Sequence, residues 1–442
     1  MPSHRRVPVG VHASLWHAPD FLKLWLGQAV SQFGSLITGF ALPLVAIVAL
    51  HATPAQIALL SAARIAPALL LGLVAGAWVD RVRRRPVLIA ADLARALVVA
   101  SVPMAAAFGR LSIALLFAVE LLCAALAVCF DAAYPAYLPS LLRPEQLVEG
   151  NSKLAASDAV AEVAGFSAAG LLVQALTAPL AIAVDALTFL VSGLSLMLIR
   201  TREPAPERAP GESGTAGAER RLSRMGGEMV AGLRLLLREP AARALAGATG
   251  LNTLGGNTLS VVLMIYLLDE LRLPPAALGV VFGLGGVSAF AGALVAGRVS
   301  RRLGPGRAIT WGMWITTVTV VLLPLASGPA WLALGMLALS QLTDGGRTIW
   351  MVNQTAVFQV AVSNALQGRL HASLRVVEAA AMAGGLVLGG VLGQVIGPRA
   401  TLGMAVGVML LAPVWVSLSP VRHLRQMGAW EAEVVPAIGR SA

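Results

Sequence analysis

Long apolar runs separated by short polar breaks occur along the whole chain of 442 residues. Each run has about 20 residues or more, enough for a helix to cross a hydrocarbon layer about 30 Å thick. Because backbone groups in lipid must find partners within the chain, each run is predicted to form one membrane-spanning helix. The twelve runs cover residues 20–50, 55–80, 86–109, 112–140, 151–177, 178–199, 241–269, 275–299, 307–327, 329–360, 369–397 and 398–420.

A segment rich in proline, glycine and charge separates the first six runs from the last six. Its composition cannot bury enough apolar surface to fold, so it is predicted to be a linker. In its second part, Leu222, Met225, Met229, Leu233 and Leu236 share one helical face, which predicts a helix lying on the membrane surface. The predicted organisation is a tail at 1–19, a bundle at 20–199, the linker at 200–240, a second bundle at 241–420 and a tail at 421–442.

The two halves of the chain resemble each other. The tetrapeptide "LVAG" occurs at 73–76 and again at 294–297, each time before an arginine-rich loop. Parallel repeats of this kind are typical of transporters whose bundles are related by an axis along the membrane normal. The predicted fold class is an all-α polytopic membrane protein, with twelve transmembrane helices in two pseudo-symmetric six-helix bundles. With almost the same offset, Gly165, Gly170 and Gln174 recur as Gly384, Gly389 and Gln394.

The basic residues are distributed unevenly between the two ends of the predicted helices. The formal net charge is +11, and most of the 33 lysines and arginines fall at the ends that adjoin the tails and the linker. Only Arg110, Arg272 and Arg399 lie in loops at the opposite ends. The positive-inside rule therefore predicts a multi-pass protein of the cell (inner) membrane with both termini cytoplasmic. The short basic loops favour anionic lipid headgroups as partners and not nucleic acid.

The sequence offers no constellation for catalysis, metal or nucleotide binding. Cys123 and Cys129 are the two cysteines, and their spacing fits no metal or redox motif. No histidine pairs with a carboxylate or cysteine at ligand spacing, and no phosphate-binding loop is present. The chain is predicted not to be an enzyme, to have no catalytic or metal-binding residues and to need no cofactor.

The loop after the second run, "GAWVDRVRRR", has glycine, three residues, an aspartate, a basic residue and further basic residues. This pattern resembles that of the major facilitator superfamily, although Arg83 stands where the family usually has glycine. The resemblance implies the two-bundle major facilitator fold and transport by alternating access. It also implies a conformational gate between the second and third helices, formed by Gly76, Asp80, Arg81, Arg84 and Arg85.

Several longer phrases resemble the branch of this superfamily that contains macrolide-efflux and enterobactin (siderophore) exporters. They are "AADLARAL" (90–97), "AAYPAYLPSLLRPEQLVEGNSKL" (132–154), "LTAPLAIAVDALTFLVSGLSLMLIR" (176–200) and "LQGRLHASLR" (366–375). The branch implies proton-coupled export of hydrophobic or amphipathic small molecules such as drugs, with the proton as coupling ion. Phe166 departs from the pattern, because antiporters commonly have proline after the glycine at this point of the fifth helix.

Charged residues within the apolar runs are candidates for proton coupling. A charge facing lipid near the bilayer centre costs about 2.5 to 3.5 kcal/mol, so these residues are expected to face each other or a wet cavity. For Asp92 with Arg95, and for Asp344 with Arg347, the spacing predicts local ion pairs. A carboxyl group near the midplane can exchange protons, because loss of hydration favours its neutral form. The candidates are Glu120, Asp158, Glu162 and Glu378.

Polar side chains in the first, second and seventh runs are candidates for lining the substrate cavity. Gln28 and Gln32 share one face of the first run, Asn252 and Asn257 lie in the seventh run, and hydrogen bonds between helices are the alternative explanation for these amides. Arg64 lies at about the depth of Glu120, so an ion pair that makes Glu120 structural is also possible. Asp185 is expected to support the fold. The cavity candidates are Gln28, Gln32, Arg64, Asn252 and Asn257.

Three other functions remain open from the sequence. A siderophore or other natural-product exporter would use Arg64 as the partner of an anionic substrate. A lipid flippase or scramblase would have a polar groove open to lipid. A non-transporting membrane sensor would tolerate neutralisation of its intramembrane acids. In every case but the last, a small molecule or lipid is the partner, and the protein is predicted to function as a monomer.

Overall fold

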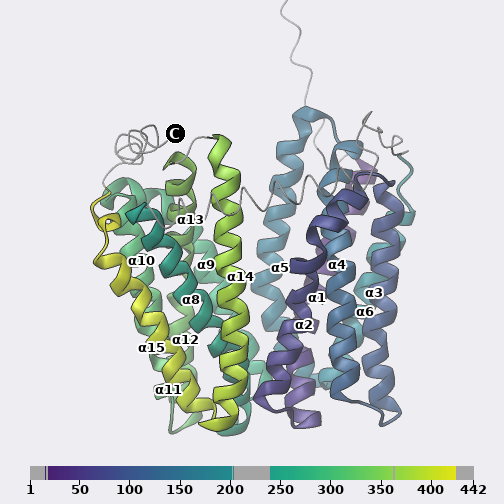
Figure 1. The fold of residues 1–442 in the computed structure, drawn as a ribbon. Helices are drawn as coiled ribbons and strands as arrows, with labels where there is room; N and C mark the ends of the chain where they lie inside the picture. The colour runs from purple at the N-terminus through teal and green to yellow at the C-terminus, as the bar shows by residue number, and fades with distance from the viewer. Residues whose placement is uncertain (1–14, 16–17, 202, 204–238, 362–363, 425–442) are drawn as a thin grey trace, which may run out of the picture.

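The computed structural model describes residue 15 and residues 18–201, 203, 239–361 and 364–424. The described residues are almost entirely helical and include no strand (Figure 1). Most of both predicted tails, most of the linker and the predicted surface helix at 222–236 lie outside the described residues. The first bundle contains α1 (Pro19–Leu44) with its continuation η2 (Val45–Ala49), α2 (Pro54–Val79), α3 (Arg84–Ala107), α4 (Ile113–Leu141), η3 (Pro144–Gln146), α5 (Leu147–Leu176) and α6 (Ala178–Met197).

The second bundle repeats this arrangement. It contains α8 (Pro240–Ile265) with its continuation η4 (Tyr266–Glu270), α9 (Pro275–Leu303), α10 (Pro305–Val320), α11 (Leu322–Leu325), α12 (Ala330–Leu342), α13 (Asp344–Ala361), α14 (Asn364–Val395), α15 (Pro398–Ser417) and η5 (Pro420–His423). Along the described chain, eleven helical segments are long and apolar enough to span a membrane. These correspond to eleven of the twelve predicted runs.

The remaining run, predicted at 329–360, is divided at Thr343 into α12 and α13, which both pack along α9. Polar residues and glycines follow the break, and Ser288 of α9 satisfies the backbone groups that the break exposes. The Ser288 hydroxyl accepts from the Gly345 amide at 2.9 Å and donates to the Leu342 carbonyl. The hydrophobic pattern located this run but did not predict its interruption.

The packing between helices confirms the internal repeat. In the first bundle α1 packs on α5 and α6, and in the second α8 packs on α14 and α15. The two main contacts between bundles are α5 with α9 and α2 with α14. Exchanging the bundles converts one of these contacts into the other, as a pseudo-two-fold axis along the membrane normal requires.

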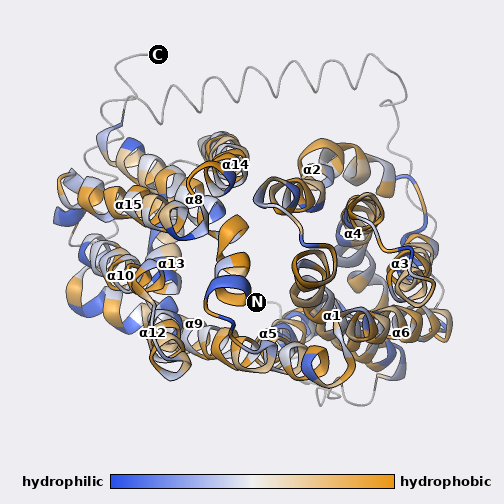
Figure 2. Cartoon of the chain, turned by 90° about the horizontal axis from the view of Figure 1, so that it is seen from below, coloured by the Kyte–Doolittle hydropathy of each residue, from blue (hydrophilic) through white to orange (hydrophobic). Residues whose placement is uncertain are grey.

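Many large apolar side chains of both bundles are exposed. Hydrophobic residues occur along the helices of both bundles (Figure 2). Leu70, Leu97 and Trp331 are examples, each more than 70% exposed. Such a surface is unfavourable in water and favourable in lipid, because the surrounding acyl chains are equally apolar. The exposed apolar surface therefore agrees with the membrane-spanning lengths of the helices.

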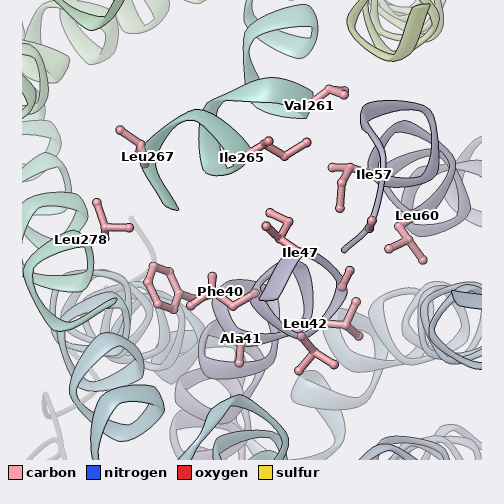
Figure 3. Close-up of a cluster of buried hydrophobic side chains, with 14 of the residues drawn as sticks. Phe40, Ala41, Leu42, Ile47, Ile57, Leu60, Val261, Ile265, Leu267 and Leu278 are labelled. Atoms are coloured by element: carbon pink, nitrogen blue, oxygen red, sulfur yellow. The ribbon is translucent and has the colours of Figure 1, made fainter. Parts of the chain in front are cut away.

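The two ends of the bundle pair differ. The start of α1 and the turn η5 both lie at the top of Figure 1, and this face is called the tail side. The opposite face, where α1 connects to α2, is called the loop side. On the loop side the bundles are joined by a buried apolar cluster, shown in Figure 3, that includes Phe40, Leu42, Ile47, Ile57, Leu60, Val261, Ile265, Leu267 and Leu278.

Glycines bring the bundles into backbone contact in the loop-side half of the molecule. A Cβ added to Gly170 of α5 would lie 2.8 Å from the Gly279 Cα of α9. A Cβ on Gly393 of α14 would lie 2.7 Å from the Pro54 Cβ at the start of α2. Toward the tail side the bundles diverge, and on α5 the side chain of Val148 is 76% exposed. The structure is therefore closed on the loop side and open toward the tail side.

Candidate functional site

A cavity of about 280 Å³ inside the first bundle gathers most of its intramembrane charge. Residues of α1, α2, α3, α4 and α6 line it. Most of the lining is apolar, and the charged side chains that reach it are Arg64, Arg95, Glu120, Asp131 and Asp185.

Arg95 of α3 is fixed by contacts within its own helix and with two neighbouring helices. Its guanidinium donates to Asp92 Oδ1 at 2.6 Å, and Ser192 of α6 donates to Asp92 Oδ2 at the same distance. The guanidinium carbon lies 4.6 Å from the ring centroids of Phe130 and Phe189, which adds cation–π attraction. Asp92 is completely buried. This confirms the predicted Asp92–Arg95 pair and shows that it also ties α3 to α4 and α6.

Asp185 of α6 has local partners as well. Its carboxylate accepts a hydrogen bond from the Thr188 hydroxyl at 3.0 Å, and only 1% of the residue is exposed. Gly34 of α1 lies directly against this pair, since a Cβ there would come within 2.5 Å of Asp185 Oδ1. Asp185 therefore packs α6 against α1, in agreement with the expected fold-supporting role.

Arg64 and Glu120 line the same cavity but form no ion pair. The Arg64 guanidinium lies beside Gly39 of α1, where an added Cβ would be 3.2 Å from one of its nitrogens. Neither side chain hydrogen-bonds to any described residue. The predicted alternative, in which Arg64 pairs with Glu120, is met only in part: the two side chains make no direct contact, but the Arg64 charge lies close enough to attract the Glu120 carboxylate. Within and beside the cavity, the carboxyl groups of Asp92, Glu120, Asp131 and Asp185 outnumber the guanidinium groups of Arg64 and Arg95.

The other predicted acids lie outside this cavity. Asp158 and Glu162 are exposed on α5, and Glu378 is half-exposed on α14. None of the three forms an ion pair or a hydrogen bond with the described residues. The structure thus does not bring the four predicted acids together, and among them only Glu120 lines the charged cavity.

The predicted cavity amides are half-buried on α1 and α8. Asn257 donates to the Thr253 carbonyl of its own helix at 2.8 Å. Gln28, Gln32 and Asn252 form no hydrogen bond within the described part of the chain. Their predicted contact with substrate stays a prediction.

The predicted gate residues separate into two groups. Asp80 follows the last residue of α2, as expected, and its exposed side chain contacts no charged group among the described residues. Gly76 faces open space, and Arg81 is exposed. Arg84 and Arg85 begin α3 and interact with the end of the same bundle instead of with Asp80.

Glu203 holds the start of α3, a role that the sequence motif does not reveal. Its carboxylate accepts from the Arg84 and Arg85 amides at 2.8 and 3.1 Å, and so caps the helix. The Arg85 guanidinium donates to the Leu196 and Met197 carbonyls at the end of α6. The gate arginines therefore bind the start of α3 to the end of α6.

The comparison with known families decides the class of protein. The sequence model of the Major Facilitator Superfamily matches residues 24–385, most of the chain. The chain belongs to the Major Facilitator Superfamily. It is accordingly a secondary transporter and not an enzyme.

Two mycobacterial relatives match part of the chain. Uncharacterised superfamily transporters of Mycobacterium tuberculosis and Mycobacterium bovis are each 36% identical over 164 residues. That stretch is 37% of this chain and 37% of each relative, so the chain matches little more than a third of their length. These relatives agree with the superfamily assignment.

Solved transporters of this superfamily share the fold at low sequence identity. A bacterial homologue of the iron transporter ferroportin in its inward-facing state has a TM-score of 0.71 and 20% identity, over 90% of this chain and 98% of that chain. The nucleoside transporter NupG has a TM-score of 0.63 and 12% identity, over 90% of this chain and 98% of that chain.

Asp131 lines the charged cavity from α4, as expected of the charges within the apolar runs, and its distance of three helical turns from Glu120 puts both carboxyl groups on one face of α4. One feature of this superfamily member was missed from the sequence. Asp20 of α1 accepts from the Arg200 and Thr201 amides at 3.0 and 2.8 Å, and thereby holds the chain as it leaves α6. Within the described residues, no group of three or more His, Cys, Asp or Glu side chains is arranged to hold a metal ion.

Proposed function

We propose that this protein exports amphipathic small molecules in exchange for protons, and that Glu120 is its coupling acid. The observation that supports the proposal is the charged cavity of the first bundle, in which Glu120 faces open space without an ion-pair partner. A carboxyl group in this position can be protonated or ionised as the two sides of the membrane are exposed in turn. Of the four predicted acids, Glu120 is the one whose surroundings favour this role.

The excess of carboxyl groups in the cavity favours exchange. An ionised site of this kind attracts protons and positively charged substrates, and binding of one weakens binding of the other. Such competition is what an antiporter requires, because each conformational cycle then carries either the proton or the substrate. Exchange of one proton for a substrate with a single positive charge moves no net charge, so only the pH gradient drives it. Each further proton that enters adds about 2.3 kcal/mol at a membrane potential of 100 mV.

We further propose that the tail side faces the cytoplasm of the cell (inner) membrane. Arg81 and Arg83 in the loop after α2 are exposed on that side, as are Arg301 and Arg302 in the last turn of α9, the helix that the internal repeat relates to α2. Positive residues of short loops are retained on the cytoplasmic side during insertion. The open side of the structure would then receive substrate from the cytoplasm.

Transport in proteoliposomes with an imposed pH gradient tests the proposal. The wild-type protein should accumulate a cationic dye such as ethidium in a manner abolished by a protonophore, and Glu120→Gln should lose at least about 90% of the gradient-dependent rate. Glu149→Gln is the matched control, since Glu149 pairs with Lys153 at the tail side, away from the cavity. If Glu120→Gln kept the gradient-dependent rate and Glu162→Gln or Glu378→Gln lost it, the residue whose variant lost the rate would be the coupling acid instead of Glu120.

An anionic siderophore or related natural product is the second candidate substrate, favoured by the unpaired guanidinium of Arg64. Binding of an anion to Arg64 would, however, stabilise the protonated form of Glu120, so that proton and substrate would bind together. That linkage drives symport and opposes export by exchange, which ranks this candidate second. Loss of transport of an anionic chelator in Arg64→Gln, with ethidium transport retained, would reverse the ranking.

A further inference from the structure

A basic pocket of about 470 Å³ lies at the tail-side end of the second bundle, between α10, α15 and η5. Both helices stand at the edge of this bundle that faces away from the first bundle (Figure 1, Figure 2). The volume falls within the range of about 300 to 1,000 Å³ that is usual for ligand pockets. Arg307, Arg422 and His423 line it, and no acidic side chain of the described residues does. The pocket is therefore suited to an anion.

The positively charged side chains of the pocket have few partners. Arg307 of α10 is exposed and forms no hydrogen bond or ion pair with the described residues. Arg422 Nε donates to His423 Nε2 at 2.9 Å, which leaves the two terminal guanidinium nitrogens of Arg422 available. A neighbouring polar pair is satisfied within the pocket wall, since Trp314 Nε1 donates to Ser417 Oγ at 3.0 Å. The unused hydrogen-bonding capacity of the pocket therefore lies mainly in its arginine donors.

The corresponding corner of the first bundle contains a carboxylate from the chain itself. The two "LVAG" tetrapeptides are 221 residues apart, and the same offset relates the first residue of α3, Arg84, to the first residue of α10, Pro305. It also relates Glu203 to Leu424. In the first bundle, Glu203 caps α3, and its Oε1 lies 3.6 Å from Arg84 Nη1. A negative charge therefore fills this corner beside the start of the third helix.

Leu424 replaces only part of what Glu203 does. The backbone carbonyl of Leu424 accepts from the Gly306 amide at 3.2 Å, and so satisfies the start of α10 without bringing a charge. Arg307 and Arg422 consequently have no counter-charge among the described residues that line the pocket. An anion from outside the chain would fill in the second bundle the place that Glu203 fills in the first.

The surface next to the arginines is apolar and indicates a lipid as the source of the anion. Trp311 lies one helical turn from Arg307 on the same face of α10 and is 58% exposed, and Leu418 of α15 is 80% exposed. From Arg307 to Trp314 the pocket extends for about 10 Å along α10, at about 1.5 Å per residue. Tryptophan is enriched where headgroups meet acyl chains. A phosphate at the arginines would thus have its acyl chains beside Trp311 and Leu418.

We infer that this pocket binds the phosphate group of an anionic phospholipid from the tail-side leaflet. Each arginine can donate two parallel hydrogen bonds to phosphate oxygens. Basic pockets between transmembrane helices bind anionic headgroups in this way. The bound phosphate connects α10 to η5, as Glu203 connects the start of α3 to the chain that follows α6. The inference goes beyond the proposed function and does not depend on proton coupling.

Native mass spectrometry of the purified full-length protein in detergent measures this binding. Phosphatidylglycerol and phosphatidylcholine with identical acyl chains are titrated separately. The wild type should bind the first phosphatidylglycerol about tenfold more tightly, and Arg307→Gln combined with Arg422→Gln should remove this preference. The matched control, Arg301→Gln combined with Arg302→Gln, removes the same charge from the last turn of α9 and should keep the preference. Equal losses in both double variants, or no loss in the pocket variant, would overturn the inference.

Two further measurements identify the source of the phosphate and the place where it binds. Displacement of phosphatidylglycerol by glycerol phosphate or inorganic phosphate, but not by chloride at the same ionic strength, would overturn the lipid assignment in favour of a soluble phosphate. Leu424→Glu introduces a carboxylate at the position equivalent to Glu203, and should weaken phosphatidylglycerol binding several-fold relative to Leu424→Gln, which has the same size without the charge. Equal binding by these two variants would show that the headgroup does not occupy this corner.

Discussion

Thr177 is strained in a way that its counterpart in the second bundle is not. It connects α5 to α6 with φ 93° and ψ 154°, a conformation that side chains other than glycine rarely adopt. At the equivalent turn between α14 and α15, Gly397 has φ 83° and ψ 163°. The Thr177 side chain is exposed and forms no hydrogen bond with the described residues. Thr177→Gly should therefore relieve strain without removing a contact.

The expected increase in the free energy of unfolding is the strain energy that is relieved minus the entropy cost of introducing glycine. A residue held in this region costs about 1 to 3 kcal/mol, and glycine costs about 0.5 to 1 kcal/mol in the entropy of the unfolded chain. The backbone bonds from Thr177 to Val173 and from Ala181 to Thr177, both 3.0 Å, are kept. The free energy of unfolding should rise by about 0.5 to 2 kcal/mol.

Thermal unfolding in detergent, at one scan rate, measures this effect. The apparent Tm of Thr177→Gly should increase by about 1 to 3 °C. The converse change, Gly397→Thr, should lower it by a similar amount, since it imposes the same strain on the equivalent turn. An unchanged or lower Tm for Thr177→Gly would refute the reasoning, and so would a Gly397→Thr variant as stable as the wild type.

Three further predictions concern the charged pair, the gate and the closure between bundles. Asp92→Ala should lower the free energy of unfolding by about 3 kcal/mol by leaving Arg95 buried and unpaired, and the double variant with Arg95→Ala should recover part of this loss in a double-mutant cycle. Glu203→Ala should remove the cap of α3 and cost about 1 kcal/mol in chemical denaturation; no loss would mean that water caps the helix equally well. Gly170→Val should force α5 away from α9 and increase labelling of single cysteines introduced on the loop side, whereas Gly72→Val, in open space, should leave that labelling unchanged.

The hydrophobic pattern was sufficient to predict the order and approximate bounds of eleven membrane-spanning helical segments and the position of a twelfth apolar run. In lipid, the backbone N–H and C=O groups of each span must form hydrogen bonds within the protein. An apolar run of sufficient length therefore forms a helix. The pattern did not reveal the break at Thr343, because its stabilisation by Ser288 depends on a helix more than 50 residues away. A contact between residues so far apart in the chain leaves no signal in the local pattern of apolar and polar residues.

The candidate site was predictable only in part, for a similar reason. Spacing within one helix located the Asp92–Arg95 pair, since i and i+3 share a face. It could not indicate that Ser192, Phe130 and Phe189 complete the pair, because they come from other helices. The cavity likewise combines residues of five helices. Its charge balance depends on how those helices rotate about their axes, which the sequence pattern leaves undefined.

The two contacts that the pseudo-two-fold axis relates have become chemically different. Between α5 and α9, Gly170, Gly279 and Gly283 allow backbone contact over more than one helical turn. Between α2 and α14, glycine contacts are confined to the loop-side end, and alanines leave an apolar groove beyond it. Motion that separates the bundles must widen one of the two helix–helix contacts between them. The contact between α2 and α14 already leaves space open to lipid, while the contact between α5 and α9 leaves none at its glycines. A fold with nearly equivalent halves therefore presents lipid with one apolar groove, on the side where α2 and α14 meet.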